Sequence, residues 1–272
     1  MSNNGKLSVP DYDEIRDGIK NLRKTLCVWM ALEAVTVVLF SLASIFAILG
    51  NKGAMKIIEF VGKHSIISIA ASVAGAAVMI MYCVQITNLR RFNGGLIVAG
   101  ILGLAMFIFS RASNAASAAS TVRDFGSNLK SVYETVITNS VTNSLILLVF
   151  MAAFRKTYYT AMEEGTMELS VPVSRMWKSL WELTLIVLGC SAVVIFALRT
   201  ALEHFVTKLT ESSYVSYEGF TDDYNLMMVL LVLIIVVAGI ADLILQFREL
   251  YCLRETADVM FPPAGEGASY RS

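Results

Sequence analysis

The sequence predicts an all-α fold, in which a bundle of six transmembrane helices forms a polytopic integral membrane protein. Hydrophobic residues make up 56% of the 272 residues and charged residues only 16%, and the mean hydropathy is +0.64. A soluble domain typically carries about 25% charged residues. Apolar runs of about 20 residues, the length that crosses the hydrocarbon core as a helix, recur along the chain. Membrane β-strands alternate apolar and polar residues, and these runs do not, so helices are expected.

Six runs are long enough to span a membrane. They cover residues 26–49, 66–87, 94–111, 138–154, 182–201 and 226–247. The first is longer than the apolar region of a secretory signal, so we expect it to remain as an anchor. Only a few residues join the second run to the third, which predicts that these two helices pack as antiparallel neighbours. The fourth begins with polar residues, and the sixth is the most strongly apolar.

The segments between the runs are short and polar. They include an N-terminal segment, 1–25, and a tail, 248–272, and none offers room for a separate folded core. We therefore expect residues 1–272 to form a single membrane domain. Trp177 and Trp181 precede the fifth run, where an aromatic belt would meet the membrane surface.

The distribution of basic residues predicts the orientation. Of the 22 lysines and arginines, 14 lie in the N-terminus, the tail and the two connections on their side. Short cytoplasmic segments carry such an excess, so both termini are expected in the cytoplasm and the chain in the cell membrane. The segment between the third and fourth runs is external in this arrangement. Its apolar residues between 122 and 136 recur at helical spacing, which predicts that the third helix continues outward or that a surface helix follows.

Ionisable groups within predicted spans are the first candidates for function, because burying them in lipid is costly. Glu33, Gln85 and Asp242 lie in runs one, two and six, all about 7–12 Å below the cytoplasmic boundary at 1.5 Å per residue. One interpretation is a pocket that attracts a cation or carries a proton. The alternative is that the carboxylates reach the nearby interface or pair with Arg248 or Lys24.

A second set of polar residues lies at the outer end of the fourth run. Asn139 and Asn143 are four residues apart and share a helix face, with Thr142 beside them. These side chains would line an outward-facing polar vestibule. Hydrogen bonding between helices is one alternative, and a later start of the fourth span, which would leave this stretch in water, is another.

Small residues predict close helix packing. Ala70/Ala74, Ala71/Gly75 and Gly95/Ala99/Gly103 follow the small-xxx-small spacing that lets helix backbones approach one another. Runs two and three are the expected partners.

The sequence lacks the motifs of several kinds of enzyme and metal site. There is no GxxxxGK[ST] loop and no HExxH, and both histidines, His64 and His204, lie outside the predicted spans. No cysteine pair has metal or redox spacing. We therefore expect no enzyme, no catalytic residues, no metal and no cofactor. The formal net charge of zero gives no basic footprint for nucleic acid.

Two functions remain open. In the first, the chain binds or moves a small solute or ion through the bundle, with Asn139, Thr142 and Asn143 as outer lining and Glu33, Gln85 and Asp242 as inner polar groups. In the second, it is a non-catalytic membrane subunit or scaffold that assembles with partner proteins. Its expected partners are the lipid bilayer and either further copies of the chain or another membrane protein.

Overall fold

The computed structural model describes residues 9–48, 65–123, 129–167, 169–210 and 217–260, and every element within these ranges is helical. The elements are α1 (Val9–Ile48), α3 (Ser65–Asn88), the short 3₁₀ helix η1 (Leu89–Arg91), α4 (Gly95–Arg123), α5 (Leu129–Met167), α6 (Val171–Thr210) and α7 (Tyr217–Met260). The all-helical prediction is confirmed for the described residues. The third predicted run continues as helix to Arg123, as one of the two alternatives for that segment anticipated.

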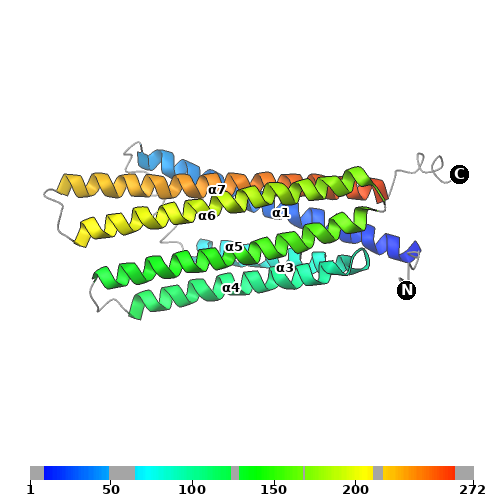
Figure 1. Ribbon diagram of the computed structural model, residues 1–272, viewed down its shortest axis with the longest axis horizontal. Coiled ribbons are helices and arrows are strands. Elements are labelled where there is room, and N and C mark those ends of the chain that lie inside the picture. The colour runs from blue at the N-terminus through cyan, green and yellow to red at the C-terminus, as the bar shows by residue number, and fades with distance from the viewer. Residues whose placement is uncertain (1–8, 49–64, 124–128, 168, 211–216, 261–272) are drawn as a thin grey trace.

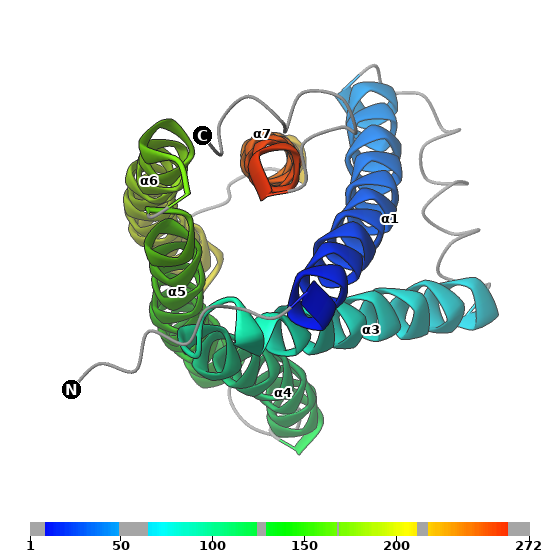
Figure 2. The ribbon, with the colours of Figure 1, turned by 90° about the vertical axis from the view of Figure 1, so that its right-hand side faces the viewer.

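The six long helices form a closed ring. Each packs against its neighbours in the chain, α1 on α3, α3 on α4, α4 on α5, α5 on α6 and α6 on α7, and α7 packs back on α1. Figure 2, which looks along the helices, shows this circular arrangement. Successive helices run in opposite directions, so the start of α1 and the end of α7 lie at the same end of the ring (Figure 1).

Among the described residues, four helices are long and apolar enough to cross a membrane. The described stretches are Val73–Arg91, Gly95–Ser113, Ile137–Met167 and Val171–His204. At most 28% of each apolar window is buried inside the protein, so most residues of these windows are at least partly exposed. Apolar surface of that extent is unusual in a soluble monomer, and the chain is compatible with a membrane protein. The predicted spans 26–49 and 226–247 lie on α1 and α7, where many side chains fall outside the described residues.

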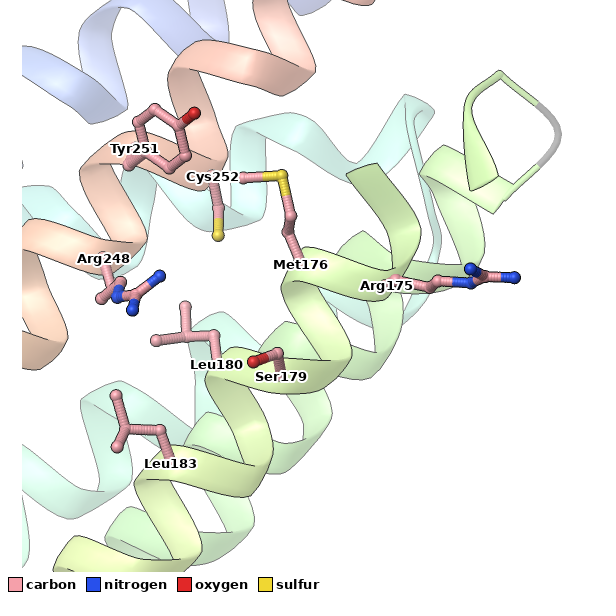
Figure 3. Close-up of a pocket in the computed structure, with 8 residues that line it drawn as sticks. All are labelled: Arg175, Met176, Ser179, Leu180, Leu183, Arg248, Tyr251 and Cys252. Carbon is pink, nitrogen blue, oxygen red and sulfur yellow. The ribbon is translucent and has the colours of Figure 1, made fainter. Parts of the chain in front are cut away.

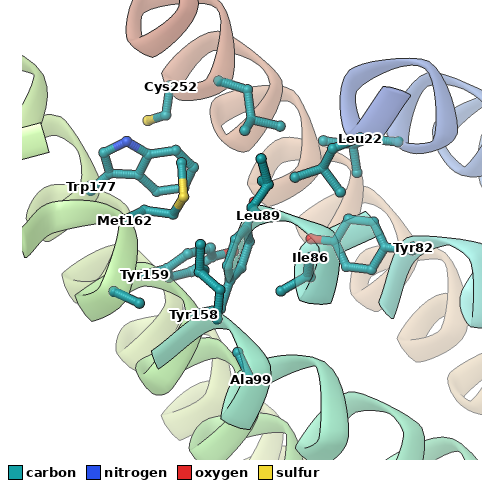
Figure 4. Close-up of a cluster of buried hydrophobic side chains, with 14 of the residues drawn as sticks. Leu22, Tyr82, Ile86, Leu89, Ala99, Tyr158, Tyr159, Met162, Trp177 and Cys252 are labelled. Atoms are coloured by element: carbon teal, nitrogen blue, oxygen red, sulfur yellow. The ribbon is translucent and has the colours of Figure 1, made fainter. Parts of the chain in front are cut away.

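The buried core lies at one end of the ring, which we call the packed end. It is the end where α1 begins, where the α3–α4 and α5–α6 connections lie, and where α7 finishes. The largest fully buried side chains here are Trp177, Tyr158, Tyr159 and Phe154. Figure 4 shows aromatic and aliphatic side chains from α1, α3, α5, α6 and α7 meeting in this core. At the opposite end, a smaller buried cluster joins Ile137 and Val141 of α5 to Val206 of α6.

The helices continue beyond the predicted spans at the packed end. In α1, Ile15, Ile19 and Leu22 are buried, although they lie in the polar N-terminal segment. They recur at i, i+4 and i+7, the spacing that puts residues on one helix face. In the same way, Cys252 and Leu253 of α7 are buried within the segment predicted as a polar tail.

Two tight connections hold this end together. In the first, the Asn93 side-chain oxygen accepts a hydrogen bond of 2.8 Å from the Gly95 amide and caps the start of α4. In the second, the amides of Leu169 and Ser170 donate to the Thr166 carbonyl at 3.0 and 2.9 Å. The short first connection confirms that the second and third predicted helices are antiparallel neighbours.

Trp177 does not take the position expected of it. It is completely buried in the core, and its indole N–H donates a 3.0 Å hydrogen bond to the Thr256 hydroxyl of α7. An aromatic belt residue faces the lipid headgroups, so the interfacial role predicted for Trp177 was wrong. The helical extension at the packed end provides the core that covers it.

Candidate functional site

A cluster of charged and polar side chains lies inside the ring, next to the aromatic core. We call it the acidic cluster, and it consists of Glu33, Arg155, Asp242, Gln246 and Glu249. Helix α7 supplies three of these residues at i, i+4 and i+7, so they share one face of that helix. Helix α1 contributes Glu33, and α5 contributes Arg155.

Arg155 is the centre of the cluster. Its guanidinium lies 3.2 Å from the Asp242 carboxylate and 3.3 Å from that of Glu249. It also donates a hydrogen bond of 2.5 Å to the Tyr159 hydroxyl, one turn further along α5. Helices α5 and α7 are not neighbours in the ring, so these ion pairs cross the interior of the ring.

The Gln246 amide joins the remaining acids. Its nitrogen donates to Asp242 at 2.8 Å and also to Glu33 on α1. Its oxygen is buried and accepts no hydrogen bond from the described residues. Buried polar groups are normally paired, so this oxygen is an available acceptor directly beside two carboxyl groups.

Tyrosine hydroxyls complete the surroundings of Glu249. Tyr82 of α3 donates to one carboxylate oxygen, and Tyr159 donates to the other at 3.2 Å. Tyr82 also packs edge-on against Trp29, Phe154 and Tyr158. The aromatic core thereby fixes the phenol that orients the carboxylate.

Exposure is graded across the acidic cluster. The side chains of Arg155 and Glu249 are 7% and 1% exposed, whereas that of Asp242 is 29% exposed. Glu33 is half-buried as well. The Glu33–Asp242 side of the cluster is therefore accessible, and the Glu249 side is sealed by the tyrosines.

The charge balance of the cluster is uneven, because it contains three carboxyl groups and one guanidinium, which pairs with only two of them. Two carboxylates that accept from the same amide repel each other unless a proton or a cation lies with them. This arrangement is suited to binding positive charge. Among the described residues, no group of three or more histidine, cysteine or acidic side chains has the arrangement of a metal site.

The structure brings together two of the residues predicted from the sequence. Glu33 and Asp242 meet through Gln246, as the pocket interpretation requires. The suggested pairing of these acids with Arg248 or Lys24 is not observed among the described residues, since Asp242 pairs with Arg155 instead. Gln85 lies half-buried on α3, and no hydrogen bond places it in the acidic cluster.

The outer polar residues are not gathered into one buried site. Asn139 and Thr142 are exposed, and Asn143 is half-buried. Beside them, a cavity of about 380 Å³ opens between α5 and α6, lined by Ile137, Thr138, Glu203, Val206 and Thr207. None of the three predicted residues lines this cavity, so the vestibule stays a prediction.

Sequence reasoning missed Arg155, Gln246 and Glu249. Arg155 lies one residue after the predicted fourth span, which ends at 154, and Glu249 lies beyond the predicted sixth span, which ends at 247. The signal was present in α7, where Asp242, Gln246 and Glu249 recur at i, i+4 and i+7. The pairing with Arg155 joins residues 87 and 94 positions apart, which no local pattern reveals.

The one strongly perturbed thiol beyond the predicted spans is inert. Burial, and after it the nearby Glu249 carboxylate, raises the pKa of Cys252 to about 12. A raised thiol pKa disfavours the thiolate, which is the nucleophilic form. Cys252 is therefore protonated at neutral pH and is no candidate nucleophile.

The chain matches no protein-family model, no curated protein and no solved structure.

Proposed function

We propose that the chain is a multi-pass membrane protein that takes up a proton or a small monovalent cation at the acidic cluster and moves it through the helix ring, alone or with a small solute. In this proposal, all six long helices span the membrane and both termini are cytoplasmic. The packed end then lies at the cytoplasmic side, and the cluster lies at the inner end of the path.

The observation that carries the proposal is the excess of carboxyl groups inside the ring. Ionisable residues are retained within membrane bundles mainly where they serve a pathway or a relay. Glu33 and Asp242 share one amide donor, and the free oxygen of Gln246 lies beside them. A bound cation, or a proton on either acid, would satisfy that oxygen and remove the repulsion between the carboxylates.

The ion pairs suggest how binding would be coupled to movement. Arg155 and a bound cation compete for the same Asp242 carboxylate, because both are positively charged. Uptake at the exposed Glu33–Asp242 side would weaken the link from α7 to α5. Glu249, which accepts hydrogen bonds from Tyr82 and Tyr159, would keep its ion pair with Arg155 during this uptake.

The test is ion flux into proteoliposomes that contain the full chain. A potassium diffusion potential drives uptake, and a trapped pH indicator reports protons while separate assays follow sodium and potassium. We expect wild-type flux of at least one of these ions. Asp242→Asn and Glu33→Gln should each abolish it, because they remove the charge that attracts the cation.

Glu182→Gln provides the matched control. Glu182 is an exposed acid on α6 that makes no contact with the acidic cluster, so its neutralisation should leave flux unchanged. Absence of flux for all three ions in the wild type, or unchanged flux in Asp242→Asn, would refute the proposal.

The alternative function is a non-transporting membrane subunit, in which the same bonds only hold the helices together. The observation that favours it is the extensive aromatic core at the packed end, which closes the ring with fixed side chains. Under this alternative, the wild type shows no flux, and Asp242→Asn lowers the unfolding temperature instead. Partner proteins that co-purify with the chain would then bind its exposed surface.

A further inference from the structure

A groove lies between α6 and α7 at the packed end, and none of the residues of the acidic cluster lines it. Its volume is about 280 Å³, near the lower end of small-molecule pockets at roughly 300–1,000 Å³. Figure 3 shows its walls. The lining residues are Arg175, Met176, Ser179, Leu180, Leu183, Arg248, Tyr251 and Cys252.

The polar part of the groove is basic and has no acidic lining residue. Arg248 extends from α7 toward α6, and the Ser179 hydroxyl lies on the facing wall (Figure 3). Arg175 stands at the rim with its guanidinium turned outward. Within the described part of the chain, neither arginine forms an ion pair. An anion with several acceptor oxygens would therefore meet one guanidinium and a hydroxyl donor in the groove.

The rest of the groove is apolar. Leu180 and Leu183 form its floor on α6. On α7, Ile244 lies one helical turn from Arg248 on the same face and is 52% exposed. We call Leu180, Leu183 and Ile244 the apolar strip; Leu180 and Leu183 line the groove, and Ile244 is exposed one turn beyond Arg248.

We infer that this groove binds the headgroup of an anionic phospholipid. The phosphate would accept from Arg248 and Ser179, and the acyl chains would follow Leu183 and Ile244. Basic pockets between membrane helices on the cytoplasmic side are suited to such headgroups. The inference rests on the proposed membrane location and orientation, and it is independent of ion transport.

The experiment measures lipid retention by the full chain in neutral detergent. Purified protein is incubated with equal amounts of phosphatidylglycerol and phosphatidylcholine of identical acyl chains, and the bound lipid is identified by native mass spectrometry. We expect the wild type to retain about five times as much phosphatidylglycerol as phosphatidylcholine. The attraction between one arginine and an anionic headgroup corresponds to about this ratio. Arg248→Gln should reduce that preference to none, and Arg175→Gln should reduce it less.

Arg254→Gln is the matched control, because Arg254 lies on the same helix, is exposed and pairs with Asp258 at 3.6 Å outside the groove. It should keep the full preference. Equal retention of both lipids by the wild type, or an unchanged preference in Arg248→Gln, would overturn the inference. Arg248 is exposed, so the variant should fold, and an unchanged lipid-free unfolding temperature verifies this.

Inorganic phosphate separates a lipid from a soluble anion. Millimolar phosphate should not displace phosphatidylglycerol, because phosphate gains nothing from the apolar strip. Leu183→Ala should weaken lipid retention for the same reason. Displacement by phosphate, with no effect of Leu183→Ala, would show that the groove binds a free anion and would contradict the lipid assignment. Loss of ion flux with lipid preference retained would refute only the transport proposal.

Discussion

Arg155 shows how one side chain determines the character of the interior. It is buried, yet it contacts two carboxylates and a phenol that belong to α5 and α7. A buried charge is tolerated only where partners replace its hydration. The same guanidinium therefore joins two helices that are not ring neighbours, while the third acid, Glu33, forms no ion pair among the described residues.

Removing this guanidinium should destabilise the fold strongly. Arg155→Gln leaves Glu249 buried without a counter-charge, and the loss of one partner of a buried pair costs about 3–5 kcal/mol. Thermal unfolding in detergent, followed by tryptophan fluorescence, measures the effect. Arg254→Gln removes an exposed ion pair, which contributes about 0–1 kcal/mol.

A double variant, Arg155→Gln with Glu249→Gln, tests the same ion pair more specifically. Glu249→Gln removes the charge that Arg155→Gln leaves behind, so the two changes together should cost less than the sum of the single ones. Equal unfolding temperatures for Arg155→Gln and Arg254→Gln would mean that the buried pairs do not hold the packed end.

At the scale of elements, small residues determine how closely α3 and α4 approach. A side-chain carbon at Gly100 would lie 2.0 Å from the Thr87 hydroxyl oxygen and 2.9 Å from the Cys83 backbone oxygen. At Gly103 the nearest atom would be the Cys83 sulfur at 2.7 Å. Helices α3 and α4, which contain the second and third predicted spans, therefore pack closely, as predicted. Gly100, which lies outside the predicted small-xxx-small series, is the tightest point.

Gly100→Ala should therefore separate the two helices. The added methyl group overlaps backbone as well as side-chain atoms, and overpacking of this kind typically costs about 1–3 kcal/mol. Gly75→Ala is the matched control on α3, because nothing lies within 4 Å of the added carbon. Alanine is the better helix former by about 1 kcal/mol, so the control should raise the unfolding temperature while Gly100→Ala lowers it. A stabilising Gly100→Ala would show that the contact is looser than described.

At the scale of the whole molecule, the closed ring of antiparallel helices places alternate connections at opposite ends. The α5–α6 connection lies at the packed end, and the exposed His204 lies on α6 near the other end. If the ring spans a membrane, these two positions face opposite compartments.

Single cysteines test this arrangement in intact cells. After replacement of Cys27, Cys83, Cys190 and Cys252, we expect Glu164→Cys to react with a membrane-impermeant thiol reagent only when the reagent reaches the cytoplasm. His204→Cys should react only from outside. Labelling of both positions from the same side would contradict a transmembrane ring, whatever the ion-flux assays show.

Much of the architecture was accessible from local patterns. The apolar runs predicted helices, and the few residues between Asn88 and Gly95 predicted an antiparallel pair. The rarity of ionisable residues within the predicted spans singled out Glu33 and Asp242. Such features depend on residues that are neighbours along one helix. Arg155 escaped notice because its role depends on partners 87 and 94 positions away. Trp177 was misplaced because the residues that it contacts lie on α5 and α7.

The sequence by itself determined that the chain forms long apolar helices, since hydropathy and helical periodicity are properties of short segments. Only the tertiary structure decided that these helices close into a ring, that the start of α1 and the end of α7 extend into a common core, and that two acids pair with one arginine beside a third acid. Those features depend on which helix faces meet. The free energy of burying a charge depends on the partners that a neighbouring helix places beside it, and the order of residues along a single helix does not determine those partners.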